Sequence, residues 1–246
     1  MKFFLAPMQG LTGYTVRNAF HHHFDYIDKY YTPFIPAAKR MNAKIKRDID
    51  PINNDGITLI PQAMSIVADE VIDLHRQLVP YGYDEINVNL GCPSGTVVSK
   101  KRGSGILAYP DMLDSFLDEL YTKADFPVSI KTRVGFNDDE LWPKLIEIYS
   151  KYPISELTVH PRVQKDFYKN TPRMDDFALA MQKINPDKTT LCYNGDITDT
   201  NSFNALTDCF PDIDEIMIGR GLFANPALIA ELKGISMDKA ELRERL

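Results

Sequence analysis

Eight short apolar segments, separated by amphipathic stretches, constrain the fold of this chain more than any other feature. They are rich in isoleucine, valine and phenylalanine and are bounded by turn residues, as parallel strands buried on both faces usually are. They cover residues 3–6, 25–31, 57–61, 85–89, 128–131, 156–160, 189–193 and 215–218. Eight strands alternating with helices predict a TIM (β/α)8 barrel, an α/β fold for which about 250 residues is typical.

The stretches between these segments carry helix signals. Pro110 and Asp111 open one amphipathic stretch, acidic residues at 138–140 open another, and Pro226 lies near the start of the last. We expect helices at residues 69–78, 112–121, 141–149, 198–206 and 223–232. The sequence therefore predicts one barrel domain over residues 1–234, followed at residues 235–246 by the start of a C-terminal helix or a truncated tail.

Composition excludes several classes of protein. Hydrophobic residues make up 44% and charged residues 25% of the chain, which is typical of a soluble globular domain. The net charge of −6 means that any nucleic-acid contact must come from a local basic patch. Three widely spaced cysteines argue against a disulfide framework and for a reducing cytoplasm. Because no apolar run approaches the ~18 residues of a membrane span, we expect a cytoplasmic protein without membrane contact.

The turns after the last two apolar segments predict a phosphate site. The turn after the seventh segment contains Asn194, Gly195 and Asp196. The turn after the eighth contains Gly219 and Arg220. Loops after strands seven and eight of this fold recurrently bind phosphate, because glycines let backbone amides approach the anion. Either turn alone would more often be a tight connection, but two on adjacent strands favour phosphate.

Polar side chains also end other segments, at the edge where barrel enzymes place their chemistry. Lys131 ends the fifth segment, where it can form a Schiff base or hold an electron-rich cofactor ring. His160 ends the sixth, although a lone histidine at a strand end is more often structural. Side chains near the ends of the first and third segments can bond or pack on a flat ring: Pro7, Met8, Gln9 and Gln62.

Cys92 follows the fourth segment in a Gly-Cys-Pro turn. Since that turn cannot continue a strand, we expect the thiol on a loop, where it is available for chemistry. Cys192 falls inside a strand and is predicted to be inert packing.

Two basic groups flank the same face. They comprise Lys100, Lys101 and Arg102 after the fourth segment, and Arg162, Lys165, Lys169 and Arg173, interleaved with Tyr168, after the sixth. Single runs of this kind are usually solvated surface, but together around a cleft they indicate an anionic macromolecular substrate. The histidines at residues 21–23 predict no metal site, because consecutive helix residues point about 100° apart.

This ordered set of motifs resembles the bacterial tRNA-dihydrouridine synthase family. The resemblance runs from residue 5 to residue 221 and is most specific in Asn-Leu-Gly-Cys-Pro-Ser at 89–94 and Gly-Ser-Gly at 103–105. The motifs at 131–135, 194–196 and 217–221 follow in the order and spacing of the family. Gly13 replaces a frequent acid, and Pro161 and Val163 depart from a more usual motif, but neither change removes a chemical role.

The resemblance implies that specific uridines in tRNA are reduced to 5,6-dihydrouridine, with FMN bound and NADPH as reductant. It makes Cys92 the catalytic acid, places Asn89 at the substrate uracil, and sets Lys131 beside the reduced flavin ring. With the basic loops, Tyr168 would contact tRNA. The matching flavin and phosphate residues are Pro7, Met8, Gln9, Gln62, Lys131, His160, Asn194, Gly195, Asp196, Gly219 and Arg220.

Members of the family usually continue into a helical domain that grips tRNA, and this sequence ends at Leu246, where that domain would begin. The sequence is then a fragment or a short natural form, or the basic loops of the barrel suffice. Three other functions stay open: an FMN-dependent reductase of a small molecule, of dihydroorotate or enoate type; a class I aldolase that uses Lys131; and a barrel that binds tRNA or flavin without turnover. We expect a monomer.

Overall fold

All strands of the protein pair in parallel in one curled sheet. A computed structural model describes residues 1–37 and 40–235. The sheet order is β3-β5-β6-β7-β8-β9-β10-β1-β2-β4. The strands are β1 (Lys2–Leu5), β2 (Lys29–Tyr31), β3 (Ile35–Pro36), β4 (Leu59–Ile60), β5 (Gln62–Met64), β6 (Ile86–Leu90), β7 (Val128–Gly135), β8 (Glu156–Val163), β9 (Thr190–Tyr193) and β10 (Glu215–Ile218).

The sheet closes on itself because two strand positions are split. β2 and β3 are successive parts of one position, and β4 and β5, separated only by Pro61, are successive parts of the next. β2 pairs with β1 and β4, while β5 pairs with β3 and β6, so the pairing continues all the way round. Pro61 has no N–H to donate to the neighbouring strand, so the ladder is interrupted between β4 and β5. The predicted TIM (β/α)8 barrel, with eight strand positions, is confirmed.

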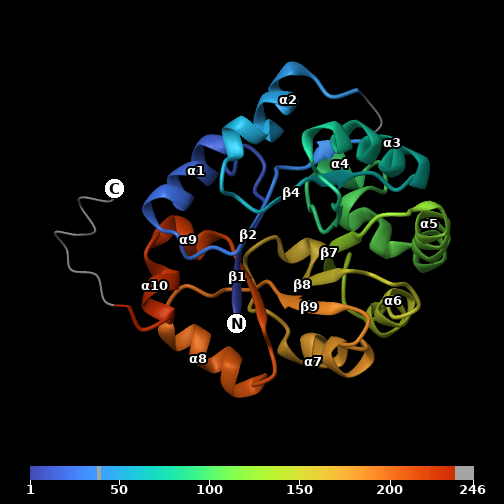
Figure 1. The fold of residues 1–246 in the computed structure, drawn as a ribbon. Coiled ribbons are helices and arrows are strands. Elements are labelled where there is room, and N and C mark those ends of the chain that lie inside the picture. Colours follow the sequence, from blue (N-terminus) through green and yellow to red (C-terminus); the bar gives the residue numbers. More distant parts are fainter. Residues whose placement is uncertain (38–39, 236–246) are drawn as a thin grey trace.

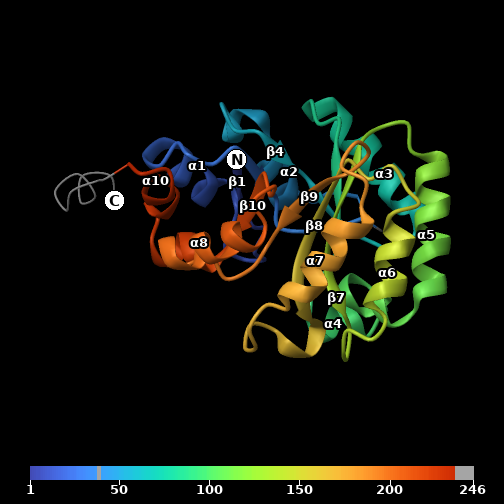
Figure 2. The same ribbon diagram turned by 90° about the horizontal axis from the view of Figure 1, so that it is seen from below.

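Helices form an outer ring around the strands (Figure 1). They are α1 (Tyr14–His23), α2 (Ala43–Ile49), α3 (Ala68–Leu78), α4 (Gly95–Val98), α5 (Pro110–Lys123), α6 (Trp142–Tyr149), α7 (Met174–Lys183), α8 (Thr200–Cys209), α9 (Arg220–Ala224) and α10 (Leu228–Leu232). Short 3₁₀ turns lie at Pro51–Asn54, Val79–Tyr81, Gly103–Ala108 and Gln164–Asp166. The N-terminus and α4 lie at opposite ends of the barrel (Figure 2). Helix α4 therefore marks the end at which the strands finish.

The structure corrects some of the predicted boundaries. β7 and β8 continue past residues 131 and 160 to Gly135 and Val163, so His160 and Arg162 lie within a strand. The single helix predicted at 223–232 is wrong, because α9 ends before Asn225 and α10 begins only after Pro226. The start of a helix or tail expected at 235–246 falls, apart from its first residue, outside the described residues.

Two layers of apolar side chains hold the barrel together. Neighbouring residues of β1 point to opposite faces, as strand geometry requires. Phe3 and Leu5 pack in the large cluster between strands and helices, and Phe4 packs inside the barrel. The inner cluster consists of Phe4, Ala6, Tyr31, Ile60, Cys192 and Met217. Cys192 is fully buried there, as its position in a strand predicts.

A group of charged side chains, most of them buried or partly buried, closes the amino-terminal end of the barrel, with Lys2 at its exposed edge. We call Lys2, Lys29, Glu85, Glu156 and Glu215 the basal cluster. Lys29 Nζ lies 2.7 Å from Glu156 Oε2, and Lys2 Nζ lies 3.0 Å from Glu215 Oε1. Burial raises the pKa of both Glu85 and Glu215.

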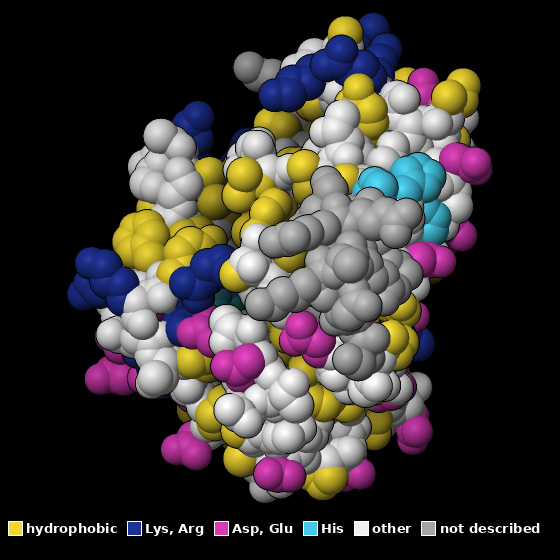
Figure 3. Space-filling model, turned by 90° about the vertical axis from the view of Figure 1, so that its left-hand side faces the viewer, with side chains coloured by type: hydrophobic (Ala, Val, Ile, Leu, Met, Phe, Trp, Pro, Cys, Tyr) yellow, Lys and Arg dark blue, Asp and Glu magenta, His cyan; other side chains and the backbone are white. Residues whose placement is uncertain are grey.

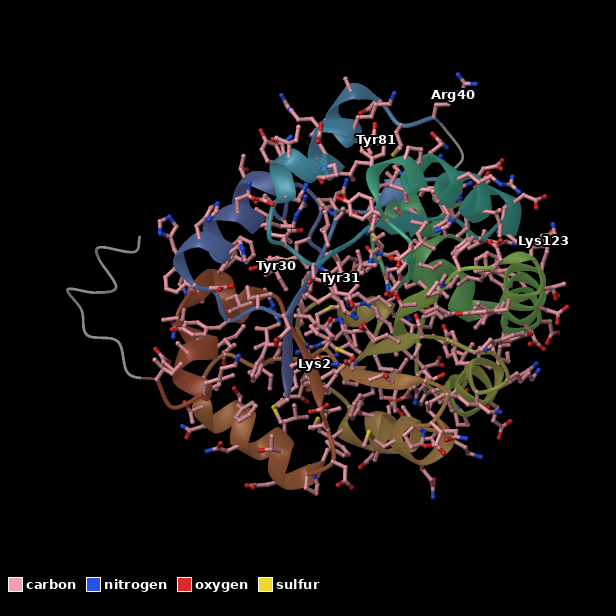
Figure 4. The ribbon with its side chains drawn as sticks, in the orientation of Figure 1. Lys2, Tyr30, Tyr31, Arg40, Tyr81 and Lys123 are labelled. Atoms are coloured by element: carbon pink, nitrogen blue, oxygen red, sulfur yellow. The ribbon has the colours of Figure 1, made fainter. Side chains whose placement is uncertain are left out.

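Tyr31 links the inner apolar layer to this cluster. Its hydroxyl donates to Glu156 Oε1 at 2.6 Å, and the side chain lies near the centre of the barrel (Figure 4). A small cavity of about 70 Å³ lies among Lys29, Glu85, Ser155, Glu156, Thr190 and Glu215. The basal cluster thus forms a polar layer at the amino-terminal end of the barrel, next to the apolar inner layer.

Candidate active site

A cleft of about 560 Å³ opens at the carboxyl ends of the strands. Its walls contain all of the residues predicted from sequence to bind the cofactor: Pro7, Met8, Gln9, Gln62, Lys131, His160, Asn194, Gly195, Asp196, Gly219 and Arg220. Asn89, Cys92 and Tyr168 line the same cleft. Five residues predicted to contact tRNA are not in its lining: Lys100, Lys101, Arg102, Arg162 and Lys165. The cleft has the size and position of a ligand site in this fold.

A chain of side-chain amides crosses the floor of the cleft. Asn87 donates to Ser129 Oγ at 3.0 Å and accepts from Gln62 Nε2 at 2.8 Å. Gln62 Oε1 in turn accepts from Asn89 Nδ2 at 2.8 Å. Each of these amides belongs to a barrel strand, Gln62 to β5 and Asn87 and Asn89 to β6, so the barrel itself fixes their orientation. The sequence analysis missed Asn87, although it lies only two residues before Asn89 in β6.

Asn89 fixes the loop that carries Cys92. Its Oδ1 accepts from the backbone N–H of Gly91 at 3.1 Å and from that of Cys92 at 2.9 Å. The Cys92 carbonyl accepts from Ser104 Oγ at 2.8 Å. A Cβ at Gly103, whose φ is +56°, would lie 2.8 Å from that carbonyl, which explains why a glycine stands here. The motifs at 89–94 and 103–105 therefore build one rigid loop around the thiol.

The Cys92 thiol is half-buried and protonated at neutral pH. Burial raises its pKa above the ordinary value, and the opposing effects of the Ser94 backbone, Arg133 and Lys131 do not cancel the rise. A thiol in this state can give up a proton but is a poor nucleophile. The nearby cations would stabilise the thiolate left behind.

Lys131 points along the cleft from β7. Burial, together with the neighbouring Arg133, lowers its pKa to about 7. Its Nζ donates to Asn194 Oδ1 at 2.6 Å, and Asn194 Nδ2 donates to the Met217 carbonyl at 2.7 Å. β9 and β10 thus orient the lysine of β7, and an anionic group placed in the cleft would raise its pKa again.

His160 is a neutral imidazole in a cation-rich wall. Burial and the surrounding cations, Arg133 first among them, hold its pKa well below the ordinary value. Arg162 Nη1 donates to His160 Nε2 at 3.2 Å. Because a guanidinium can only donate, Nε2 accepts and the ring proton lies on Nδ1.

Arg162 is placed differently from its predicted tRNA-facing position. Only 1% of the residue is exposed, its Nε donates to the Asn170 carbonyl at 2.6 Å, and its Nη1 donates to Asp196 Oδ1 at 2.9 Å. Arg220 Nη2 donates to the same Asp196 oxygen at 2.6 Å. Asp196 therefore binds two arginines at the end of the cleft where the sequence predicts a phosphate, and Arg162 supports that end from within the wall.

Glycines are required in both turns at this end. A Cβ at Gly195 would lie 2.0 Å from the Tyr193 hydroxyl, and one at Gly221 would lie 2.1 Å from the Ile197 carbonyl. A side chain at either place would displace these neighbours, so both turns are tightly packed, and Gly195 itself lines the cleft.

Arg133 is the most important residue that the sequence analysis left unassigned. Its Nε, Nη1 and Nη2 donate to the carbonyls of Gly91, Val163 and Phe167 at 3.0, 3.0 and 2.8 Å. It thereby joins the loops after β6 and β8 across the cleft. Its place beside Lys131 in a strand-end motif is the signal that could have identified it.

The loop after β8 forms the mouth of the cleft with two exposed aromatic rings. Phe167 has φ +50° and ψ −91°, a backbone conformation that residues other than glycine rarely adopt. Tyr168 is 49% exposed. The centroid of its ring lies 4.8 Å from Arg220 Cζ and 5.8 Å from Arg133 Cζ. These rings offer a flat apolar surface backed by positive charge.

The basic loop residues differ in how free their charges are. Lys100 and Lys165 are exposed. Arg102 is bound to Glu70, with Nη2 3.2 Å from Oε2, and Lys101 Nζ lies 4.4 Å from the Tyr109 ring. The three consecutive cations therefore do not contribute equally to the surface charge.

Within the described part of the chain, no cluster of three or more histidine, cysteine, aspartate or glutamate side chains is arranged to hold a metal ion. Nor does any helix there have the length and apolar character needed to cross a membrane. Cys92, Cys192 and Cys209 are all free thiols.

A parallel barrel with a cleft at the carboxyl ends of its strands, lined by Lys131, Arg133 and Arg220 among apolar side chains, defines a TIM-barrel enzyme. The fold resembles that of morphinone reductase, with a TM-score of 0.63 at 10% identity, covering 98% of this chain and 88% of the other. The family model described as dihydrouridine synthase (Dus) matches residues 4–245. The chain belongs to the dihydrouridine synthase family.

Two curated relatives illustrate the extent of this similarity. The tRNA-dihydrouridine synthase B of Pasteurella multocida is 26% identical over 243 residues, which is 95% of this chain and 69% of that protein. A probable tRNA-dihydrouridine synthase of Staphylococcus aureus is 34% identical over 154 residues, which is 61% of this chain and 46% of that protein. The matches thus cover about half to two thirds of the relatives' lengths.

Proposed function

We propose that this protein reduces uridine in tRNA to 5,6-dihydrouridine, with FMN as cofactor and NADPH as electron donor, in the reducing cytoplasm. Membership of the dihydrouridine synthase family supports the reaction. The observation that carries the proposal is the protonated thiol of Cys92, held by Asn89 in the same cleft as Lys131. An aldolase would use the lysine but has no need for this thiol.

The residues of the cleft fit a flavin mononucleotide. Its volume lies within the range of about 300–1,000 Å³ that is usual for cofactor sites. Gln62 and Lys131 offer hydrogen-bond donors to the edge of a flat ring, and Met8 offers an apolar surface. At the other end, Arg220 and the tight glycine turns suit a phosphate. Asp196 limits the positive charge there by pairing with both arginines.

The reaction divides between cofactor and protein. When bound, reduced FMN supplies the hydride that is added to C6 of the uracil ring. Cys92 Sγ donates a proton to C5, so that the ring gains one hydride and one proton and the 5,6 double bond becomes single. Arg133 and Lys131 then stabilise the Cys92 thiolate until it is reprotonated from solvent. Lys131, with its pKa near 7, gains a proton beside negative charge and holds it there.

The target base must leave its stack to reach this cleft. Extruding a base costs a few kcal/mol, which contacts at the new site must repay. Tyr168 offers a stacking surface at the mouth, and Asn89 and Arg133 lie deeper in the lining. We assign residues 1–234 to this catalytic barrel.

Purification and a turnover assay test the proposal together. The protein should be yellow, release FMN on denaturation, and form dihydrouridine in tRNA that lacks it when NADPH is supplied. A colourless protein that takes up no added FMN would overturn the cofactor assignment. A yellow protein that reduces enones or dihydropyrimidine precursors but leaves tRNA unchanged would instead identify a small-molecule reductase.

A further inference from the structure

The exposed cations of the described residues fall into paired and unpaired groups. On the helices α5, α6 and α7 and directly after them, the lysines form ion pairs with neighbouring acids. They are Lys123, Lys144, Lys151 and Lys183. Four cations on and just before α2 form no ion pair with any described residue. We call these four the α2 patch: Arg40, Lys44, Lys46 and Arg47, all of them exposed.

The acidic residues of the same segment turn away from the α2 patch. Asp48 Oδ1 accepts from the Tyr14 N–H at 2.7 Å, and its Oδ2 lies 3.3 Å from Nη1 of the fully buried Arg17. Asp50 accepts from the Ile52 N–H at 3.1 Å, where it caps the following turn. Both carboxylates thus have partners within the protein, Asp48 with buried Arg17 and Asp50 with the next turn of the chain, and neither forms an ion pair with a cation of the α2 patch.

In the space-filling view, Lys and Arg side chains gather at the top of the molecule, where α2 lies (Figure 3). Arg40 stands at the same end and points away from the barrel (Figure 4). None of the residues of the α2 patch lines the cleft.

We propose that the α2 patch binds the phosphate backbone of the tRNA body while the cleft holds the target base. This inference rests on the proposed function. The protein as a whole carries a net charge of −6 and repels a polyanion, so binding needs cations that are not already neutralised. Near the cleft, Arg102 is paired with Glu70, while Lys100 and Lys165 are exposed. On α2, four cations lie together and are free to displace counterions from phosphates. A surface on α2 also gives the enzyme contact with tRNA beyond the single extruded base.

A pair of triple variants with the same charge change tests the proposal. One is Lys44→Gln/Lys46→Gln/Arg47→Gln on α2, and the matched control is Lys144→Gln/Lys151→Gln/Lys183→Gln, where each lysine is ion-paired. The tRNA dissociation constant is measured at several salt concentrations by fluorescence anisotropy, with FMN-loaded protein. The slope of log K against log salt changes by about 0.7–0.9 for each phosphate contact.

We expect the α2 variant to lose about 2–3 units of that slope and to bind tRNA about 10–100-fold more weakly at 0.15 M salt. The control should keep the slope of the unmodified protein. Flavin content and NADPH oxidation without tRNA should stay unchanged in both variants. A thermal melt that matches the unmodified protein confirms that α2 still folds.

Other outcomes separate the two proposals. If the unmodified protein makes dihydrouridine and the α2 variant keeps its salt slope, the inference about α2 is wrong and the proposed function stands. If the unmodified protein neither binds nor modifies tRNA, the proposed function itself fails. Loss of binding to phosphatidylserine vesicles with unchanged tRNA binding would assign the α2 patch to a lipid surface and overturn the inference.

Discussion

The two ends of this barrel differ in how their charges are balanced. At the carboxyl end, Lys131, Arg133 and Arg220 line the cleft and Arg162 is buried in its wall, with Asp196 as the acid among them. At the amino end, three glutamates face two lysines in the basal cluster. A cationic cleft can accept an anionic ligand and stabilise a thiolate, whereas the basal cluster is compensated from within. The difference shows how one scaffold separates chemistry from stability, as TIM barrels generally do.

The largest expected effect distinguishes Cys92, in the cleft, from Cys192, in the buried inner layer of the barrel. Cys92→Ala should leave flavin content intact and slow the oxidation of pre-reduced enzyme by tRNA by ~10²–10⁴-fold, because it removes the general acid. Cys192→Ala, in the buried inner layer, should lower the melting temperature and leave that rate unchanged. Single-turnover kinetics measures the rate, and calorimetry measures the melting temperature. Equal rates for Cys92→Ala and the unmodified protein would remove the cysteine from the reaction.

Breaking the basal cluster should affect stability alone. Glu156→Ala leaves Lys29 and the Tyr31 hydroxyl without their partner and should cost about 3–5 kcal/mol of unfolding free energy. Urea denaturation measures this loss. Glu147→Ala, which removes an exposed pair with Lys183, should cost less than about 1 kcal/mol. A Glu156→Ala protein that is stable but fails to reduce tRNA would show that the two ends are not independent.

The smallest expected effect is a pH dependence of opposite sign at the two ends. The raised pKa of Glu215 makes the native state hold a proton that the unfolded state releases, so this residue lowers stability as pH rises above about 4.5. The lowered pKa of Lys131 makes the native state shed a proton first, so this residue raises stability between about pH 7 and 10.5.

Two conservative variants separate these slopes. Relative to the unmodified, cofactor-free protein, Glu215→Gln should gain stability as pH rises from 4.5, and Lys131→Met should lose relative stability as pH rises above 7. Chemical denaturation at a series of pH values measures both differences. Parallel pH curves for either variant and the unmodified protein would contradict the environment that we describe for that residue.

The sequence predicts the barrel well because each strand is a local apolar run. Glu215–Ile218 appears in the structure with the predicted bounds. The splits at residues 32–34 and at Pro61 escape prediction, because they depend on which neighbour each strand pairs with. The last helix was predicted as one unit with Pro226 near its start, but the proline separates two helices instead.

Prediction of the site succeeds and fails for similar reasons. Residues at strand ends, such as Lys131 and Cys92, converge because all strands are parallel and finish at one edge. Partners that come from distant segments could not be read from spacing. Arg162 has a charge suited to RNA, but only the fold shows that Asp196, 34 residues later, holds it inside the wall. Arg102 is likewise bound by Glu70, 32 residues earlier.

The left-handed backbone of Phe167 has a consequence for how the mouth of the cleft behaves over time. Such a conformation costs on the order of 1–3 kcal/mol and persists only where surrounding contacts impose it. Here the Arg133 guanidinium binds the Phe167 carbonyl, and Asp166 accepts from the Val163 N–H. The shape of this wall is therefore imposed by its neighbours and is not the one that its own chain prefers. The wall at the mouth of the cleft therefore keeps its shape only as long as these contacts are made.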